Sequence, residues 1–183
     1  MRLFLGLPIP PEVTQALTRL TRAIELPKGR PTATENIHLT LVFLGEVPEP
    51  KLTPIEHELS ELNFAPFQLK LTSLNTFPRA GVLFAEVEPA RQLLHLQAKV
   101  AASMGRCGFA PEDRAYHPHI TLARFQGPLR LGENQQTLSP SLRRSFIADT
   151  VNLYRSNLTP TGSRYEIVAL KKSSKSSTPI PSA

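Results

Sequence analysis

Cysteine is nearly missing from this 183-residue chain, since Cys107 is the only one. A single thiol cannot form an internal disulfide, and it cannot build a four-thiolate zinc site or a cysteine-ligated iron–sulfur cluster. One unpaired thiol suits a reducing compartment, so we expect a cytoplasmic protein.

Long apolar stretches are missing too. None approaches the ~18 residues that a membrane-spanning helix needs, so we expect no membrane association. The apolar N-terminus soon meets Pro8, Pro10 and Pro11, too early for the apolar core of a secretory signal peptide. We therefore interpret residues 2–7 as a first β-strand.

Three common nucleotide- and acyl-transfer signatures are also absent. The chain has no Gly-x-x-x-x-Gly-Lys-Ser/Thr loop, no Gly-x-Gly-x-x-Gly turn and no Gly-x-Ser-x-Gly elbow. P-loop nucleotide hydrolysis, Rossmann dinucleotide binding and α/β-hydrolase chemistry therefore lack their usual sequence support.

Acidic residues are the scarcer charged class. The chain has 21 lysines and arginines against 15 acidic residues, for a formal net charge of +6, and 14 of the 21 cations are arginine. The planar guanidinium donates paired hydrogen bonds to phosphate, so this composition favours a phosphate-bearing partner. A solvated basic surface explains the same charge equally well.

Proline, with 18 residues against 9 glycines, marks most boundaries between elements. The second helix opens with Thr53-Pro54-Ile55-Glu56, which matches a capping box. We expect residues 1–171 to form one domain and 172–183 to be a disordered polar tail. Hydrophobic periodicity predicts strands over 2–7, 37–44, 67–74, 81–87, 117–125, 146–155 and 164–170, and helices over 11–24, 53–62 and 90–105.

The chain contains a weak internal repeat. Pro10 and Pro89 each follow an apolar strand and open a helix, 79 residues apart. His38 and His119 each lie early in the strand after that helix, 81 residues apart. Two offsets that agree within two residues predict two strand–helix–strand halves.

Each half carries the same short motif, His-x-Thr followed by Leu. The two copies are His38-Leu39-Thr40-Leu41 and His119-Ile120-Thr121-Leu122. Because side chains alternate along a strand, each histidine shares a face with its threonine while the aliphatic residues enter the core. If the two strands are neighbours, both histidines and both threonines meet at one place.

Such a cluster suits displacement at phosphorus. Imidazole titrates near neutral pH, so a neutral histidine can accept a proton from water while a protonated one donates to the leaving oxygen. The threonine hydroxyls can donate hydrogen bonds to nonbridging phosphate oxygens. Arg124 could bind the phosphate as well, but a regular strand turns it away from Thr121, so this role needs a bulge or the strand end to redirect it.

The other three histidines have less specific settings. His57 and His95 lie within predicted helices, and we expect them to be surface or packing residues. His117 shares a strand face with His119, and together with His38 these could supply three zinc ligands. No acidic cluster accompanies them to orient such ligands, so we expect no metal.

These motifs resemble the two-histidine (2H) phosphoesterase superfamily, and within it the LigT-like RNA 2′,3′-cyclic phosphodiesterases, also called 2′-5′ RNA ligases. The resemblance covers residues 1–171 and rests on 2–8, 36–45 and 117–124, with Leu153-Tyr154 and Arg164-Tyr165 also similar. It implies an α+β bilobal fold, in which two pseudo-symmetric halves line a central cleft with antiparallel sheets and carry their helices outside.

The resemblance also implies a reaction. RNA 2′,3′-cyclic phosphate ends would be hydrolysed to 2′-phosphates without a metal or cofactor, and the reverse reaction would join RNA ends through a 2′-5′ linkage. His38 would donate the proton to the leaving 3′ oxygen, and His119 would accept a proton from water. Thr40 and Thr121 would hold the phosphate.

Three aromatic residues could stack on a terminal base, although each fits a core position at least as well: Phe43, Phe125 and Tyr154. The expected partner is RNA or a nucleotide with a 2′,3′-cyclic phosphate end, bound by a monomer. Two alternatives stay open, namely a phosphodiesterase for another small cyclic or 2′-5′-linked nucleotide, and a non-catalytic RNA-binding module.

Overall fold

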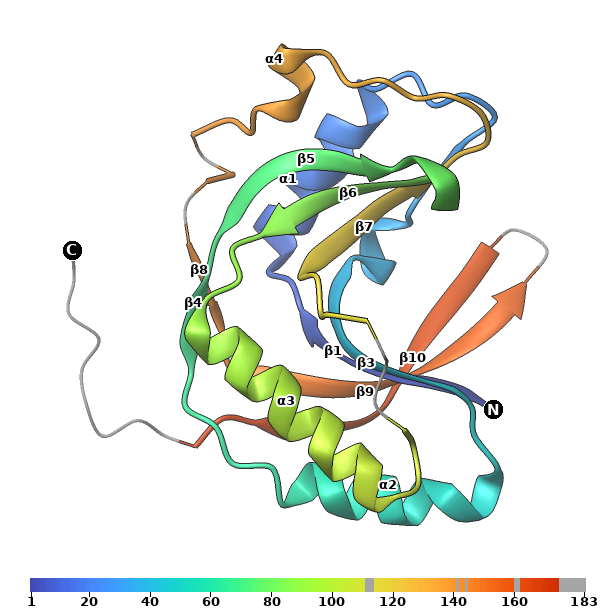
Figure 1. Cartoon of the computed structure of the whole chain (residues 1–183), viewed down its shortest axis with the longest axis vertical. Helices are drawn as coiled ribbons and strands as arrows, with labels where there is room; N and C mark the ends of the chain where they lie inside the picture. Colours follow the sequence, from blue (N-terminus) through green and yellow to red (C-terminus); the bar gives the residue numbers. More distant parts are fainter. Residues whose placement is uncertain (111–113, 141, 144, 160–161, 175–183) are drawn as a thin grey trace.

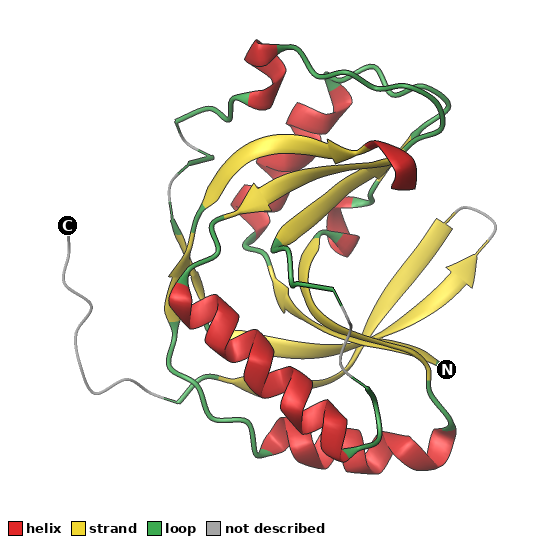
Figure 2. Ribbon diagram, in the orientation of Figure 1, coloured by secondary structure: helices red, strands yellow, loops and turns green. Residues whose placement is uncertain are grey.

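Residues 1–110, 114–140, 142–143, 145–159 and 162–174 are described by a computed structural model (Figures 1 and 2). The strands are β1 (Arg2–Pro8), β2 (Arg30–Pro31), β3 (His38–Glu46), β4 (Phe67–Leu69), β5 (Leu71–Phe77), β6 (Val82–Val87), β7 (His119–Arg124), β8 (Phe146–Ala148), β9 (Thr150–Thr159) and β10 (Gly162–Lys172). The helices are α1 (Pro11–Arg22), α2 (Leu52–Ser60), α3 (Arg91–Arg106) and α4 (Glu133–Gln136), with 3₁₀ turns at Thr34–Asn36, Glu49–Lys51 and Pro78–Ala80.

One antiparallel sheet carries the histidine strands at its centre. Its strand order is β10-β9-β1-β3-β7-β6-β5, and β2 pairs separately with β7. Only one residue pair, Leu39 with Ile120, joins β3 to β7. The sheet therefore bends into the two lobes visible in Figure 1, which confirms the α+β bilobal fold and merges the two expected sheets into one.

The helices are exchanged between the two halves. In the sequence α1 lies between β1 and β3, yet it contacts β7. Conversely, α3 lies between β6 and β7, yet it contacts β3. Each half thus covers the histidine strand of the other, so the halves are interleaved. Neither half therefore buries its own apolar surface alone.

The aliphatic residues of both motifs lie in the core, as the alternation predicted. Leu39 and Ile120 are fully buried, and Leu122 is nearly so. They pack in one hydrophobic cluster with the β1 leucines, including Leu3 and Leu5. Burying side chains of this size stabilises the fold by about 1.5–3 kcal/mol each relative to exposure, so the core holds the motif strands in register.

Both motif strands carry a β-bulge immediately after the threonine. In the β1–β3 ladder Leu5 pairs with Val42 and Gly6 with Thr40, so Leu41 is the bulged residue and has no pairing partner on β1. In the β6–β7 ladder the pairing likewise skips Leu122. An extra residue reverses the alternation beyond it, so residues three positions after each threonine return to the threonine's face.

Two predicted strands are divided in the structure. Residues 67–74 split at Lys70 into β4 and β5, and 146–155 split at Asp149 into β8 and β9. The separated pieces β4 and β8 pair with each other in a small second sheet. The pairing partner changes at each break, and hydrophobic pattern alone does not encode such a change.

Two other expectations need correction. Thr53 caps no helix, because a 3₁₀ turn at Glu49–Lys51 leads into α2 and places Thr53 inside its first turn. The tail begins later than expected, since β10 reaches Lys172 and the amides of Ser173 and Ser174 donate to backbone carbonyls. Residues 175–183 of the predicted tail lie outside the described part of the chain.

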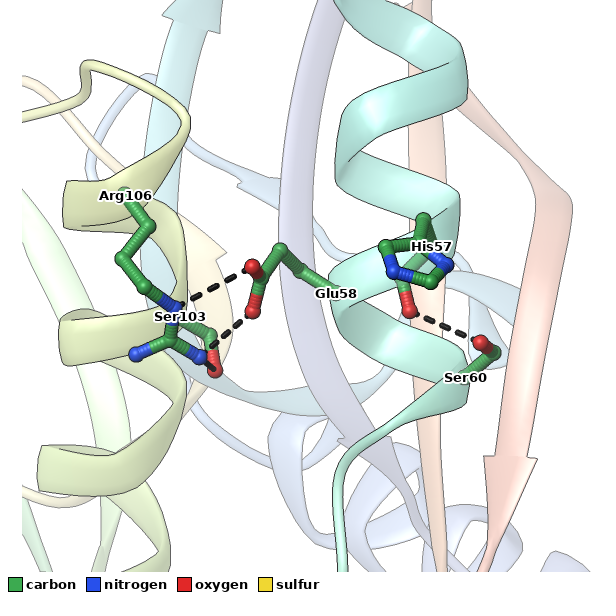
Figure 3. A network of polar contacts seen from close by, with 5 residues as sticks. All are labelled: His57, Glu58, Ser60, Ser103 and Arg106. Carbon is green, nitrogen blue, oxygen red and sulfur yellow. Dashed lines mark hydrogen bonds and ion pairs between the residues drawn. The ribbon is translucent and has the colours of Figure 1, made fainter.

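An ion pair between Glu58 and Arg106 joins α2 to α3 (Figure 3). Arg106 Nε donates to Glu58 Oε1 at 3.1 Å, and Nη2 donates to Glu58 Oε2 at 2.5 Å. Nη2 also donates to Ser103 Oγ at 2.9 Å. The hydrogen bonds from Arg106 lower the pKa of Glu58, so its carboxylate is ionised at neutral pH.

Candidate active site

The two histidine strands meet where the lobes join. Leu39 pairs with Ile120 in antiparallel register, so the residues flanking that pair lie opposite each other on the other face of the sheet. Thr40 therefore lies across from His119, and His38 across from Thr121. The structure brings together the four side chains that the repeated motif predicted.

Each histidine is oriented by the same backbone bond. His38 Nδ1 lies 2.6 Å from the carbonyl oxygen of Asn36, and His119 Nδ1 lies 2.7 Å from that of His117. A carbonyl only accepts hydrogen bonds, so Nδ1 of each ring carries the hydrogen. Nε2 is consequently the nitrogen that gains or loses a proton in both rings.

His38 lies inside an aromatic enclosure. Its ring centroid is 4.7 Å from that of Phe4, 5.6 Å from Tyr154 and 5.2 Å from Tyr165. His38 Nε2 lies 3.0 Å from the hydroxyl of Thr40. Burial lowers the pKa of His38 to about 4, a change that the carbonyl of Asn36 partly offsets and that His119 increases.

His119 has a more open setting. Phe77 and Phe84 present ring edges to it, with centroid distances of 5.3 Å each. Burial lowers the pKa of His119 as well, a change that the carbonyl of His117 partly offsets and that the His117 ring, 6.1 Å away between centroids, slightly increases. Both rings are therefore neutral in the free protein at neutral pH.

A cavity of about 890 Å³ opens beside His119. Thr40 and His119 line it together with apolar side chains, while His38 and Thr121 are not among its lining residues. The hydroxyl of Thr40 thus connects the enclosed His38 to the cavity. Further lining residues are Phe43, Phe77, Phe109, Tyr116, Arg79 and Arg114.

The bulge redirects Arg124 as that prediction required. Arg124 pairs with Val82, Thr121 with Phe84 and His119 with Glu86, and these alternate partners share one face of β6. The backbone therefore places Arg124 on the same face as His119 and Thr121. Its side chain is exposed and does not line the cavity.

The three predicted stacking residues have different surroundings. Phe43 is 41 % exposed and lines the cavity, and the guanidinium of Arg2 lies 5.0 Å from its ring. Phe125, by contrast, is 5 % exposed inside the core, so its ring cannot reach a base and that prediction is wrong. Tyr154 is also buried and stacks on Phe4 with centroids 4.9 Å apart, so it encloses His38 instead.

The remaining histidines follow their expected settings where the structure bears on them. His57 and His95 are exposed on α2 and α3. His117 Nε2 lies 3.6 Å from Glu86 Oε1. Within the part of the chain that the structure describes, no three histidine, cysteine or acidic side chains gather as a metal site requires.

Several residues of the site carry no motif that would reveal them. Tyr116 donates its hydroxyl hydrogen to the Thr40 carbonyl at 2.8 Å, and Tyr165 reaches His38 from β10. Arg79 and Arg114 line the cavity from loops and turns. Long-range folding brings these residues to the site, and their local sequence gives no signal beyond the proximity of Tyr116 to the second motif.

Two pseudo-equivalent histidine strands, joined in one antiparallel sheet beside a cavity, define a two-histidine phosphoesterase. The chain belongs to the 2′-5′ RNA ligase superfamily, whose family model matches residues 9–160. Its helices include none that combines the length and apolar character needed to cross a bilayer, among the residues described.

Known relatives cover nearly the whole chain. It is 29 % identical over 177 residues to the RNA 2′,3′-cyclic phosphodiesterase of Methanocaldococcus jannaschii, covering 92 % of this chain and 98 % of the relative. It is 30 % identical over 168 residues to the protein of that name from Escherichia coli K12, covering 90 % and 92 %. The solved structure of E. coli LigT complexed with 3′-AMP superposes with a TM-score of 0.80 at 27 % identity, covering 95 % of this chain and 98 % of LigT.

Proposed function

We propose that this protein is an RNA 2′,3′-cyclic phosphodiesterase that opens the cyclic phosphate to a 2′-phosphate by two-histidine acid–base catalysis. One observation carries the proposal. The Nδ1–H groups of the two pseudo-equivalent histidines are bound to carbonyls, so Nε2 is the nitrogen of each ring that can exchange a proton, and each histidine shares a strand face with a threonine hydroxyl. The relatives named for this activity support it.

In the proposed reaction, His119 Nε2 accepts a proton from water, and the water oxygen bonds to phosphorus. The bond from phosphorus to the 3′ oxygen breaks, and His38 Nε2 supplies the proton that this oxygen needs. Thr40 and Thr121 donate hydrogen bonds to the nonbridging oxygens, whose charge increases in the transition state. The products are a 2′-phosphate and a 3′-hydroxyl, and solvent restores the two protonation states.

The different exposure of the rings supports this division of roles. His119 lines the cavity, where water can reach it, whereas His38 is enclosed by aromatic rings. A buried imidazolium with a lowered pKa is a strong acid toward a leaving alkoxide. The bound phosphodiester carries a negative charge, which raises the pKa of a histidine beside it, so substrate binding favours the protonated form of His38.

The free enzyme needs one protonated and one neutral histidine, which makes the pH profile of kcat/KM bell-shaped. Because burial lowers the pKa of both rings, we expect the maximum on the acid side of pH 6.5. Profiles of kcat should lie at higher pH, since they report the complex in which phosphate raises both values. A maximum of kcat/KM above pH 7.5 would contradict this assignment.

The direct test uses an oligoribonucleotide ending in a 2′,3′-cyclic phosphate. We expect His38→Gln and His119→Gln each to lower kcat about 10²–10⁴-fold while circular dichroism shows an intact fold. His95→Gln, exposed on α3, is the matched control and should keep wild-type rates. Phosphorus NMR should show a 2′-phosphate product, and activity should persist in excess EDTA.

Several outcomes would reject the proposal. A wild-type rate in either active-site variant would remove the two-histidine mechanism, and loss of activity in EDTA that zinc restores would favour a metal site. Tight binding of the oligonucleotide with no product over hours would indicate an RNA-binding module. Incubation of the 2′,3′-cyclic phosphate end with a 5′-hydroxyl RNA, with a 5′-phosphorylated RNA as the control, tests whether the same site also joins ends. In that reaction the 5′ hydroxyl takes the place of water, its oxygen bonds to phosphorus, and the bond from phosphorus to the 3′ oxygen breaks to leave a 2′-5′ linkage.

We further propose that the protein acts as a monomer in the cytoplasm. Both histidines and the cavity come from one chain, so no second copy is needed to complete the site. The single thiol of Cys107 is buried and unpaired, which suits a reducing compartment. Sedimentation at assay concentrations should give the monomer mass, and a dimer would contradict this proposal.

A further inference from the structure

Asn36 and His117 occupy equivalent places in the two halves, 81 residues apart in the sequence. The backbone carbonyl of each accepts the Nδ1–H of the histidine two residues later. Their side chains behave differently. His117 lines the cavity and lies near Glu86, whereas Asn36 is 8 % exposed and does not line the cavity.

The side chain of Asn36 is bonded to a segment more than 120 residues away. Its Nδ2 donates to the carbonyl of Ser163 at 2.6 Å, and its Oδ1 accepts from the amide of Tyr165 at 3.3 Å. Both partners lie on β10, the outer strand of the β9–β10 hairpin that projects to one side in Figure 1. Asn36 thereby joins the turn before β3 to this hairpin.

The same stretch of β10 completes the enclosure of His38. The ring of Tyr165 meets His38 and Phe4 edge-on, at centroid distances of 5.2 and 4.9 Å. Tyr154 closes the enclosure from β9. Among the described residues, the titratable side chains that face His38 are these two tyrosines and His119 across the sheet, and none of them is an acid that would hold a proton on the ring.

We propose that Asn36 is a positioning residue for His38, because its side chain fixes to β10 both the carbonyl that orients the imidazole and the tyrosine that shields it from water. His119 has no such attachment, since its carbonyl partner belongs to His117 at the edge of the cavity. None of the described residues of the hairpin lines the cavity, yet the hairpin is in this way part of the acid–base site. The kinetic consequence rests on the proposed function, but the effect on the ring does not.

The test is an NMR titration of the two histidines in the full chain, with no substrate present. In Asn36→Ala we expect the pKa of His38 to rise as water enters, because burial lowers this pKa by more than the Asn36 carbonyl raises it, while the pKa of His119 stays at its wild-type value. The Nδ1–H resonance of His38 should broaden through faster exchange. In assays of the cyclic-phosphate oligonucleotide, kcat should fall at least tenfold with KM changed less than twofold.

Two further variants complete the test. Arg106→Gln removes a polar link at a distant surface of α3 and is the control, so it should leave the pKa of both histidines unchanged. Tyr165→Leu keeps the backbone amide that Asn36 binds but removes the ring, so it should also raise the pKa of His38. It tests the shielding by Tyr165 on its own if Asn36→Ala does not fold.

The outcomes are separable. An unchanged pKa of His38 in either Asn36→Ala or Tyr165→Leu would overturn the positioning role, as would an equal change at His119. A shifted pKa of His38 with unchanged kcat would uphold the positioning role and instead contradict the proposed function of His38.

Discussion

His38 and His119 donate Nδ1–H to carbonyls in the same way, yet their rings have different neighbours. Aromatic rings enclose the first, and the second borders the cavity. Two copies of one motif thus acquire different proton affinities from their surroundings, which is the condition for one to donate and the other to accept a proton.

The lowered pKa of His38 makes stability depend on pH. The pKa is about 4 in the folded protein and 6.5 in the unfolded chain, so between these values the unfolded state binds more protons and stability falls with falling pH. The loss is complete below pH 4 and is on the order of 3 kcal/mol. Urea unfolding at pH 7 and pH 4 should show it, and His119 adds to it in the same direction.

His38→Gln is the informative variant for this dependence. It should reduce the difference in unfolding free energy between pH 7 and pH 4, whatever its effect on stability at pH 7. His57→Gln, on the exposed side of α2, should keep the wild-type difference. An undiminished difference in His38→Gln would show that other groups cause the acid sensitivity.

Gly6 provides a second prediction for single residues. A Cβ at this position would lie 2.8 Å from the Leu39 carbonyl oxygen and 3.4 Å from His38 Cδ2. Because backbone atoms cannot move away without straining the sheet, Gly6→Ala should lower the free energy of unfolding by about 1–3 kcal/mol. It should also lower kcat by displacing the His38 ring. Gly105→Ala, where a Cβ has open space on α3, should instead stabilise by about 0.5–1 kcal/mol. Equal effects of the two substitutions in urea unfolding would contradict the close approach.

At the scale of elements, the paired bulges decide which side chains face the site. Leu41 and Leu122 are the extra residues, so Phe43 and Arg124, again 81 positions apart, return to the faces of Thr40 and Thr121. The two halves therefore continue each His-Thr pair with a different third group, an aromatic ring in one and a guanidinium in the other. Such a pair suits the two parts of a nucleotide end, base and phosphate.

The α2–α3 ion pair yields a prediction for elements away from the site. Glu58 and Arg106 form paired hydrogen bonds on the surface, where solvent screens their attraction. Arg106→Gln and Glu58→Gln should each lower Tm slightly, with the double variant no worse than the poorer single one. In 1 M salt the difference in Tm between each variant and the wild type should shrink. The kcat of the variants should equal that of the wild type. A large loss of activity would mean that α3 transmits this contact to the cavity.

Over the whole molecule, the exchanged helices and the excess of cations act together. Helices α1 and α3 each contact the histidine strand of the other half, and Arg79 and Arg114 line the cavity within a chain of formal charge +6. Guanidinium groups at the cavity can contact phosphates beyond the reacting one, so a longer RNA gains interactions that a mononucleotide cannot make.

Salt should therefore discriminate between substrates. We expect KM for a cyclic-phosphate oligoribonucleotide to rise with salt more steeply than KM for 2′,3′-cyclic AMP, by about 0.7 in the log–log slope for each additional phosphate contact. Arg79→Gln and Arg114→Gln should reduce this slope, and Arg106→Gln should preserve it. Identical slopes for the two substrates would place the basic groups outside the RNA path.

Local sequence was sufficient to predict most of the elements and which side chains of the two motifs share a face. Strand alternation requires only neighbouring residues, so it predicted that His38 and Thr40 share a face while Leu39 is buried, and the repeat predicted the same for the second motif. Resemblance to a known family supplied the bilobal fold, which the structure confirms. A role for Arg124 required a bulge or the strand end to redirect it. The sequence did not show where such a bulge lies, and the structure places it at Leu122.

Long-range packing accounts for what local pattern could not show. The breaks at Lys70 and Asp149, the burial of Phe125 and the exchange of α1 and α3 all depend on partners distant in the chain. So does the enclosure of His38, whose proton affinity is set by rings from β1, β9 and β10. The sequence by itself thus indicates which residues can perform acid–base chemistry. Their pKa values depend on desolvation, which the tertiary structure decides because it exists only once the chain has folded.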